Sequence, residues 1–181
     1  MMKSALLVID VQDSFLHRDE WSDDDFPAFS ASLCRLISGC ERLGIPVVDI
    51  FHVSEGVFAP DSGYVKRMSF LTHTAAKTVQ KHVHSALAAA SLSDWLTEEA
   101  IDRLIICGMR TEQCCETTAR AARDSGFDVQ FISEATLTFA MQWQGQAYTA
   151  DEIRQHTGMV LNGRFADVLT VEECLQRQGL C

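Results

Sequence analysis

An acid, a cation and a thiol lie at or after the carboxyl ends of three predicted strands in this sequence. They are Asp10, Lys81 and Cys114. Short apolar runs without polar alternation are typical of strands that are buried on both faces of a parallel sheet. Ligands bind beyond the carboxyl ends of such strands. We therefore expect these three side chains to lie at one edge of a sheet, where they can act on a small molecule.

The thiol is the member whose chemistry is most specific. Cys114 lies in the first turn of a helix that is predicted to begin near Thr111. The positive end of a helix favours a thiolate, and its unpaired N–H groups can hold an oxyanion. A carboxylate that takes the thiol proton and a lysine that stabilises negative charge would complete a site for acyl transfer through a thioester.

Each of the three residues also has a purely structural interpretation. A cysteine near a helix start is often a small buried residue. Asp10 is in a position where aspartate commonly forms a turn or caps a helix. Lys81 taken alone is typical of a solvated residue on an edge strand. The residue types alone leave these interpretations open.

Alternating strands and helices must position these side chains. Strands are predicted at residues 4–9, 46–53, 78–83, 104–107, 127–132 and 168–170. Helices are predicted at residues 26–43, 91–100, 111–125 and 150–161, with a last one beginning near residue 171. Such alternation predicts an α/β fold with a mostly parallel sheet. The chain has no internal repeat or linker composition, so we expect a single domain over residues 1–181.

Composition and charge exclude several classes of protein. Apolar residues make up 47% of the chain and charged residues 22%, which is ordinary for a globular protein. The net charge of −10 argues against nucleic-acid binding and against a polybasic membrane surface. No transmembrane run or signal peptide is predicted. The seven cysteines are an odd number without a CxxC pair, which favours a reducing, cytoplasmic location.

Four segments of the chain resemble the isochorismatase-like cysteine hydrolases, a family that includes nicotinamidases. They are residues 5–16 (ALLVIDVQDSFL), 81–87 (KHVHSAL), 108–122 (GMRTEQCCETTARAA) and 161–169 (LNGRFADVL). The resemblance spans nearly the whole chain. It implies a three-layer α/β/α, Rossmann-like fold whose six-stranded, mostly parallel sheet has the order 3-2-1-4-5-6.

The resemblance also implies roles for individual residues. Cys114 would be the nucleophile, Asp10 the general base and Lys81 their electrostatic partner. A cis peptide between Met109 and Arg110 would aim the Arg110 N–H, beside that of Cys114, at a substrate oxyanion. The implied reaction is hydrolysis of a small amide or a related C–N bond. The residues expected to bind the substrate are Gln12, Phe15, His84, Arg110 and Thr111.

The chain departs from the family's nicotinamidases at their metal site. Those enzymes carry an Asp-x-His pair near the end of the second strand, followed by a later His. Here Asp49 and His52 are three positions apart, and the next histidine is His73. We therefore expect no metal and no cofactor, and the departure argues against nicotinamide itself as the substrate.

A rival hypothesis is a non-enzymatic protein on the same fold, which binds a small ligand or senses thiol oxidation. Cys115 follows the expected nucleophile directly, and it or Cys107 would resolve an oxidised Cys114. The presence of all three residues of the triad favours the enzyme. The resemblance implies a small-molecule substrate and a homo-oligomer, either a dimer or a tetramer.

Overall fold

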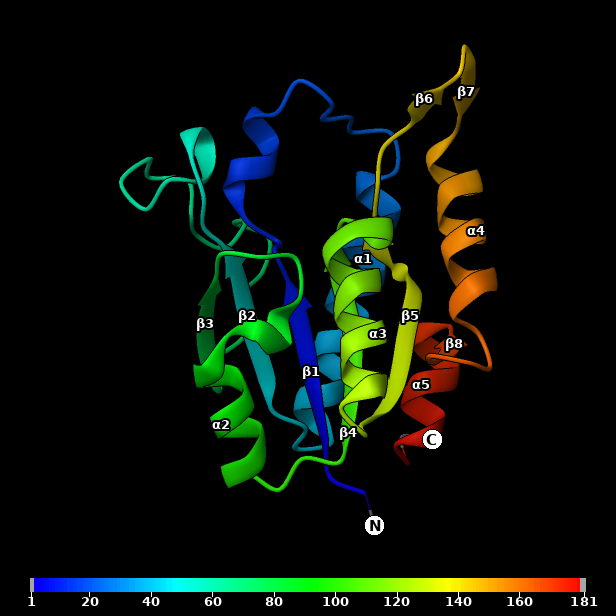
Figure 1. The fold of residues 1–181 in the computed structure, drawn as a ribbon. Helices are drawn as coiled ribbons and strands as arrows, with labels where there is room; N and C mark the ends of the chain where they lie inside the picture. The colour runs from blue at the N-terminus through cyan, green and yellow to red at the C-terminus, as the bar shows by residue number, and fades with distance from the viewer. Residues whose placement is uncertain (1, 180–181) are drawn as a thin grey trace.

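A six-stranded parallel sheet forms the centre of the computed structural model, which describes residues 2–179 (Figure 1). The sheet order is β3-β2-β1-β4-β5-β8. Its strands are β1 (Ser4–Ile9), β2 (Val47–His52), β3 (Lys77–Lys81), β4 (Arg103–Met109), β5 (Asp128–Leu137) and β8 (Asp167–Leu169). This confirms the predicted order, because β8 is the predicted sixth strand.

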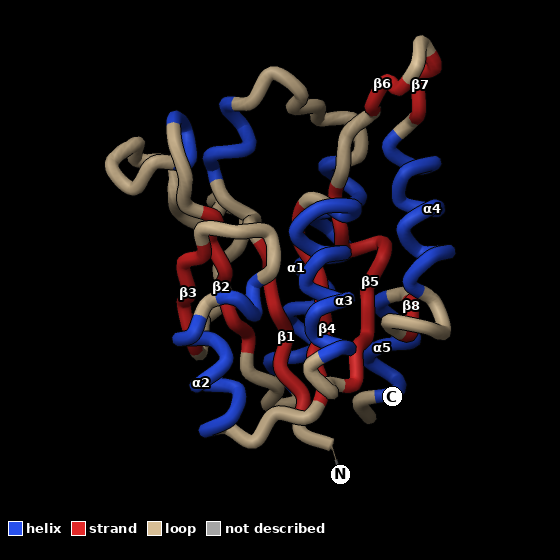
Figure 2. Tube along the Cα trace, viewed as in Figure 1, coloured by secondary structure: helices blue, strands red, loops and turns tan. Residues whose placement is uncertain are grey.

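Helices cover both faces of the sheet, which gives three layers (Figure 2). They are α1 (Phe26–Arg42), α2 (Ala90–Glu98), α3 (Glu116–Asp124), α4 (Ala150–Leu161) and α5 (Val171–Arg177). A hydrophobic core lies on each face of the sheet, and alternate residues of β1 pack into one or the other. Leu6 and Val8 face α1 and α5, whereas Leu7 and Ile9 face α2 and α3. Because both faces are covered, every residue of β1 is buried, and the strand reads as a continuous apolar run.

The stretch that follows the fifth strand differs from the prediction. β5 extends to Leu137 and is followed by an antiparallel hairpin of β6 (Met141–Trp143) and β7 (Gln146–Tyr148). The hairpin projects beyond the sheet at its carboxyl end (Figure 1). Its turn, Gln144 and Gly145, has positive φ angles of 50° and 79°. Each strand has only three residues, which is shorter than the runs of about 4–8 residues by which strands are predicted.

Short helical segments complete the chain. The 3-10 helices are η1 (Asp13–His17), η2 (Gly56–Phe58) and η3 (Ala86–Ala88). The predicted helix at residues 111–125 is instead a π-helical turn, η4 (Thr111–Cys115), continued by α3. Among residues 2–179, no helix has both the length and the apolar character that crossing a membrane requires.

Candidate active site

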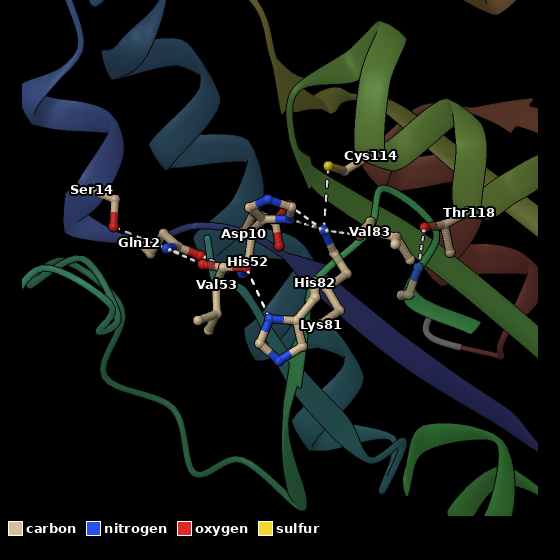
Figure 3. A network of polar contacts seen from close by, with 11 residues as sticks. Asp10, Gln12, Ser14, His52, Val53, Lys81, His82, Val83, Cys114 and Thr118 are labelled. Carbon is tan, nitrogen blue, oxygen red and sulfur yellow. Dashed lines mark hydrogen bonds and ion pairs between the residues drawn. The ribbon is translucent and has the colours of Figure 1, made fainter. Parts of the chain in front are cut away.

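The carboxyl ends of neighbouring strands bring Asp10, Lys81 and Cys114 together (Figure 3). Asp10 follows β1, Lys81 ends β3, and Cys114 lies in the η4 turn after β4. Lys81 Nζ lies 2.9 Å from Asp10 Oδ2 and 3.3 Å from Cys114 Sγ. All three side chains are buried. The juxtaposition expected from the sequence is therefore present in the structure.

Close contact between β1 and β4 makes this arrangement possible. Ile9 pairs with Gly108, and a Cβ atom on Gly108 would lie 2.0 Å from the Ile9 carbonyl oxygen. Gly108 also has a φ of 117°, a region that favours glycine. One residue beyond Ile9, Asp10 has a φ of 55°, and its N–H donates to the carbonyl of Ile50. These backbone constraints fix the point from which the Asp10 carboxylate extends toward Lys81.

The Lys81 ammonium is the centre of the polar network. Besides Asp10 and Cys114, its Nζ lies 3.2 Å from His52 Nδ1 and 3.2 Å from the Val83 carbonyl oxygen. The ammonium nitrogen and the Asp10 carboxylate are both inaccessible to solvent, as the side-chain exposures of 0% show. Such a buried ion pair holds its geometry because either charge alone would be costly in this environment.

Burial also controls the protonation states of the acid and the thiol. Burial raises the pKa of Asp10 above its ordinary value of 3.8, although the Lys81 ammonium opposes the shift. Burial and the neighbouring Asp10 carboxylate raise the pKa of the Cys114 thiol to about 12. The sequence-based expectation of a favoured thiolate is thus wrong for the resting protein, where burial is the largest influence on the pKa of Cys114.

His52 is held in place by Gln12. The Gln12 Nε2 donates to the His52 carbonyl over 3.0 Å, and the Gln12 Oε1 accepts from the His52 N–H over 2.8 Å (Figure 3). Gln12 is fully buried and also donates to Ser14 Oγ. This corrects the prediction that Gln12 contacts substrate: its amide groups are engaged by the protein and support His52 instead.

A cavity of about 200 Å³ opens above the buried cluster. Its walls contain the predicted Phe15, His84, Arg110 and Cys114. The other lining residues are Arg18, Glu20, His52, Ser54, Phe58 and Gln113. Thr111, which was predicted to bind substrate, does not line this cavity; its hydroxyl donates to Thr136 Oγ1 over 2.8 Å and ties the η4 turn to β5.

The charged residues on the cavity wall include two that sequence reasoning missed. Glu20 forms ion pairs with Arg18 at 2.8 Å and with Arg110 at 3.5 Å. The Arg110 guanidinium also pairs with Glu112 at 3.1 Å and lies over the Phe139 ring. Arg18 and Glu20 follow η1 in an irregular segment, where no periodic pattern marks which side chains turn inward.

The donor atoms near the ammonium do not suit a bound metal ion. Asp10, His52 and Cys114 each offer one ligand atom, and these atoms lie within 4.8 Å of one another. The Lys81 ammonium contacts all three residues, so a cation is already present among these donors. A metal ion there would meet like charge at close range.

Two of the three residues named for the metal pattern, Asp49 and His73, lie in a separate cluster. Asp49 Oδ1 lies 2.8 Å from His73 Nε2, and Asp49 also pairs with Arg67. This buried cluster fastens the loop before β3 to the middle of β2. Its carboxylate is engaged by side chains of the protein, and His52 lies outside it.

Two further expectations concern the η4 turn. The Met109–Arg110 peptide is cis, as the resemblance implied. Cys115 is fully buried in the core on the α2 and α3 face, and burial raises the pKa of its thiol well above the ordinary range. These surroundings are those of a small packing residue.

Comparison with known proteins agrees with this fold. The family model described as the isochorismatase domain matches residues 4–173. The Bacillus subtilis isochorismatase family protein YddQ is 27% identical over 180 residues, covering 97% of this chain and 100% of that protein.

Two further similarities involve a plant protein and a solved structure. Nicotinamidase 3 of Arabidopsis thaliana is 29% identical over 153 residues, with 75% of this chain and 74% of that protein covered. An isochorismatase-type crystal structure from Burkholderia xenovorans has a TM-score of 0.88 and 27% identity, covering 98% of this chain and 88% of that one. With the family model spanning all the strands and the buried Asp–Lys–Cys cluster, we conclude that the chain belongs to the isochorismatase family.

Proposed function

We propose that this hydrolase cleaves a small amide, or a related C–N bond, through a thioester on Cys114. The observation that carries the proposal is the position of the Lys81 ammonium, 2.9 Å from the Asp10 carboxylate and 3.3 Å from the Cys114 sulfur, under a cavity of about 200 Å³. A cavity of about 200 Å³ is smaller than the pockets of about 300–1,000 Å³ that hold drug-sized ligands, which favours a small substrate. The likeness to a relative named a nicotinamidase supports an amide substrate.

The first half of the reaction transfers an acyl group to the thiol. Asp10 accepts the Cys114 proton, and the sulfur attacks the amide carbonyl carbon. The buried carboxylate suits this role, because its raised pKa makes it a stronger base than an exposed aspartate. Its Oδ1 atom is buried without a hydrogen-bond partner in the described structure, so it is free to receive the proton.

Three groups stabilise the charge that develops. Lys81 stabilises the thiolate, while the backbone N–H groups of Arg110 and Cys114 bind the oxyanion of the tetrahedral intermediate. When the intermediate collapses, the C–N bond breaks and Asp10 returns its proton to the leaving nitrogen. The product amine departs and leaves the acyl group on the sulfur.

The second half of the reaction releases the acid. Asp10 takes a proton from an entering water as the water oxygen attacks the thioester carbonyl carbon. The C–S bond breaks, and Asp10 returns the proton to the sulfur. Atoms and charge balance without a metal or a cofactor, and the thiol is regenerated in its protonated form.

The test is release of ammonia or amine from a panel of small amides by the purified protein. We expect C114A to lose turnover by several orders of magnitude, as removal of a catalytic nucleophile does. C115A is the matched control, because Cys115 is adjacent but packs in the core. Turnover that survives in C114A would refute the thioester mechanism, whereas a parent protein that hydrolyses none of the amides would favour a binding or redox-sensing protein.

A further inference from the structure

We propose that His52 is a positioning residue that competes with Cys114 for the Lys81 ammonium and so keeps the resting thiol protonated. The inference rests on the proposed function, because Cys114 is the nucleophile of that reaction. It assigns a task to a cavity-lining residue that the catalytic steps above leave unused.

The Lys81 ammonium is surrounded by more hydrogen-bond acceptors than it has donors. An ammonium carries three N–H donors and no acceptor. Four acceptors lie within reach of Nζ: Asp10 Oδ2 at 2.9 Å, His52 Nδ1 at 3.2 Å, the Val83 carbonyl oxygen at 3.2 Å and Cys114 Sγ at 3.3 Å. Three donors cannot form full hydrogen bonds to four acceptors. The acceptors therefore compete.

His52 is a permanent acceptor in this competition. Burial and the adjacent ammonium lower the pKa of His52 to about 4, so its ring is neutral at physiological pH. Because an ammonium only donates, Nδ1 presents its lone pair to Lys81 and the ring proton resides on Nε2. Gln12 holds both backbone groups of His52, which is paired with Lys81 across β2 and β3.

The groups around the Cys114 sulfur decide which acceptor loses its hydrogen bond from Lys81. Those that face it or line the same cavity are Asp10, Arg18, Glu20, His52, Lys81, His84 and Arg110. In the resting site the Asp10 carboxylate holds the ammonium, since it carries the compensating charge. A neutral thiol is a weak acceptor, whereas an imidazole nitrogen is a good one.

In the resting site Lys81 therefore donates to His52 Nδ1 in preference to the Cys114 thiol. A thiolate reverses the order, because a hydrogen bond to a charged acceptor is stronger than one to a neutral acceptor. Lys81 then donates to sulfur and releases His52. The imidazole thus acts against thiolate formation in the empty site, and the thiol is activated when substrate and Asp10 act together.

The experiment measures the alkylation rate of Cys114 by iodoacetamide against pH, with the labelled cysteine identified by peptide mass. H52L removes the competing acceptor. We expect the apparent pKa of Cys114 to fall by about 1, with labelling about tenfold faster below that pKa, because one hydrogen bond to the thiolate is gained.

Two variants serve as controls. In H52N the amide oxygen takes the place of Nδ1 and accepts from Lys81, so we expect the parental pKa. H82L makes the same change one residue from Lys81, where the imidazole contacts the Val53 carbonyl instead, and should also leave the pKa unchanged.

Either of two results overturns the proposal. One is an H52L variant whose Cys114 labels no faster than the parent, including no labelling at all. The other is an equal shift in H52L and H52N, which would mean that the acceptor atom is irrelevant. Loss of turnover in C114A is a separate outcome, so the proposed function can hold while this inference fails.

Discussion

Replacement of Lys81 by methionine tests whether the buried ion pair exists as the structure has it. Methionine keeps most of the aliphatic stem and removes the ammonium. The Asp10 carboxylate would then lose its ion-pair partner at a position with no solvent access. Its other oxygen is already buried without a hydrogen-bond partner in the described residues. Within residues 2–179 no second cation contacts the carboxylate, so the lost ammonium is not replaced.

The expected cost follows from this geometry. Breaking a buried pair by removing one partner costs about 3–5 kcal/mol of the free energy of unfolding. The cost depends on pH because the pKa of Asp10 is already raised in the folded parent and rises further without Lys81. A carboxyl with a raised folded pKa contributes stability below its unfolded pKa and loses it as pH rises through the folded pKa. The deficit of K81M should therefore be largest at neutral pH and should shrink as pH falls toward the ordinary aspartate value of 3.8.

Urea denaturation of K81M at neutral and mildly acidic pH measures this deficit. K66M is the matched control: Lys66 lies 3.7 Å from Asp13 at the surface, where an ion pair is worth about 0–1 kcal/mol. The double variant D10N/K81M should recover part of the loss, because it removes the stranded charge. A K81M protein as stable as K66M at neutral pH would refute the reasoning.

Three further predictions concern Gly108, Asp10 and Asp49. G108A should cost several kcal/mol in thermal or urea unfolding, because its Cβ would lie 2.0 Å from a backbone oxygen of β1, whereas G158A, whose Cβ would meet nothing closer than 3.7 Å, should be tolerated. Equal stability of the two variants would contradict this. Turnover should fall with decreasing pH as Asp10 becomes protonated, with a midpoint above 3.8, and a midpoint at or below that value would contradict the raised pKa. Burial opposes ionisation of Asp49, but bonds from its histidine and arginine partners prevail and lower its pKa. D49N should therefore cost about 1–3 kcal/mol at neutral pH. The difference in the free energy of unfolding between the parent and D49N should disappear as pH falls through the lowered pKa of Asp49. Urea unfolding at neutral pH and at a pH below that pKa checks the trend.

The inner strands of the sheet were predictable because they are buried on both faces. Continuous apolar runs such as residues 4–9 marked their positions, and the resemblance supplied the order. The β6–β7 hairpin was missed since its strands have only three residues each and project beyond the core. Runs and alternations of apolar residues indicate which strands are buried. This hairpin is largely exposed, so such patterns do not mark it.

The site was predictable only in part, for a different physical reason. Ligands bind beyond the carboxyl ends of parallel strands, and this rule predicted that Asp10, Lys81 and Cys114 lie together. It could do so because it depends on strand order alone. It could not show that Gln12 bonds the His52 backbone or that Thr111 bonds Thr136, since side-chain partners depend on three-dimensional packing.

The thiol pKa shows the same limit. The prediction took into account only the positive end of the helix, which favours a thiolate. In the folded protein, burial and the neighbouring carboxylate raise the pKa of Cys114 to about 12. Sequence spacing specifies neither the depth of burial nor the distance to Asp10. The Arg18 and Glu20 pair on the cavity wall lies in an irregular segment and was missed for a related reason.

The central claim is a thioester on Cys114, and its most direct measurement is the mass of the acylated peptide. The protein is mixed with an amide that it hydrolyses, quenched in acid during turnover, digested and analysed by mass spectrometry. We predict an acyl adduct on the peptide that contains Cys114, removed by hydroxylamine and absent in C114A. Turnover with no adduct on Cys114, at an equal rate in C114A, would contradict the mechanism.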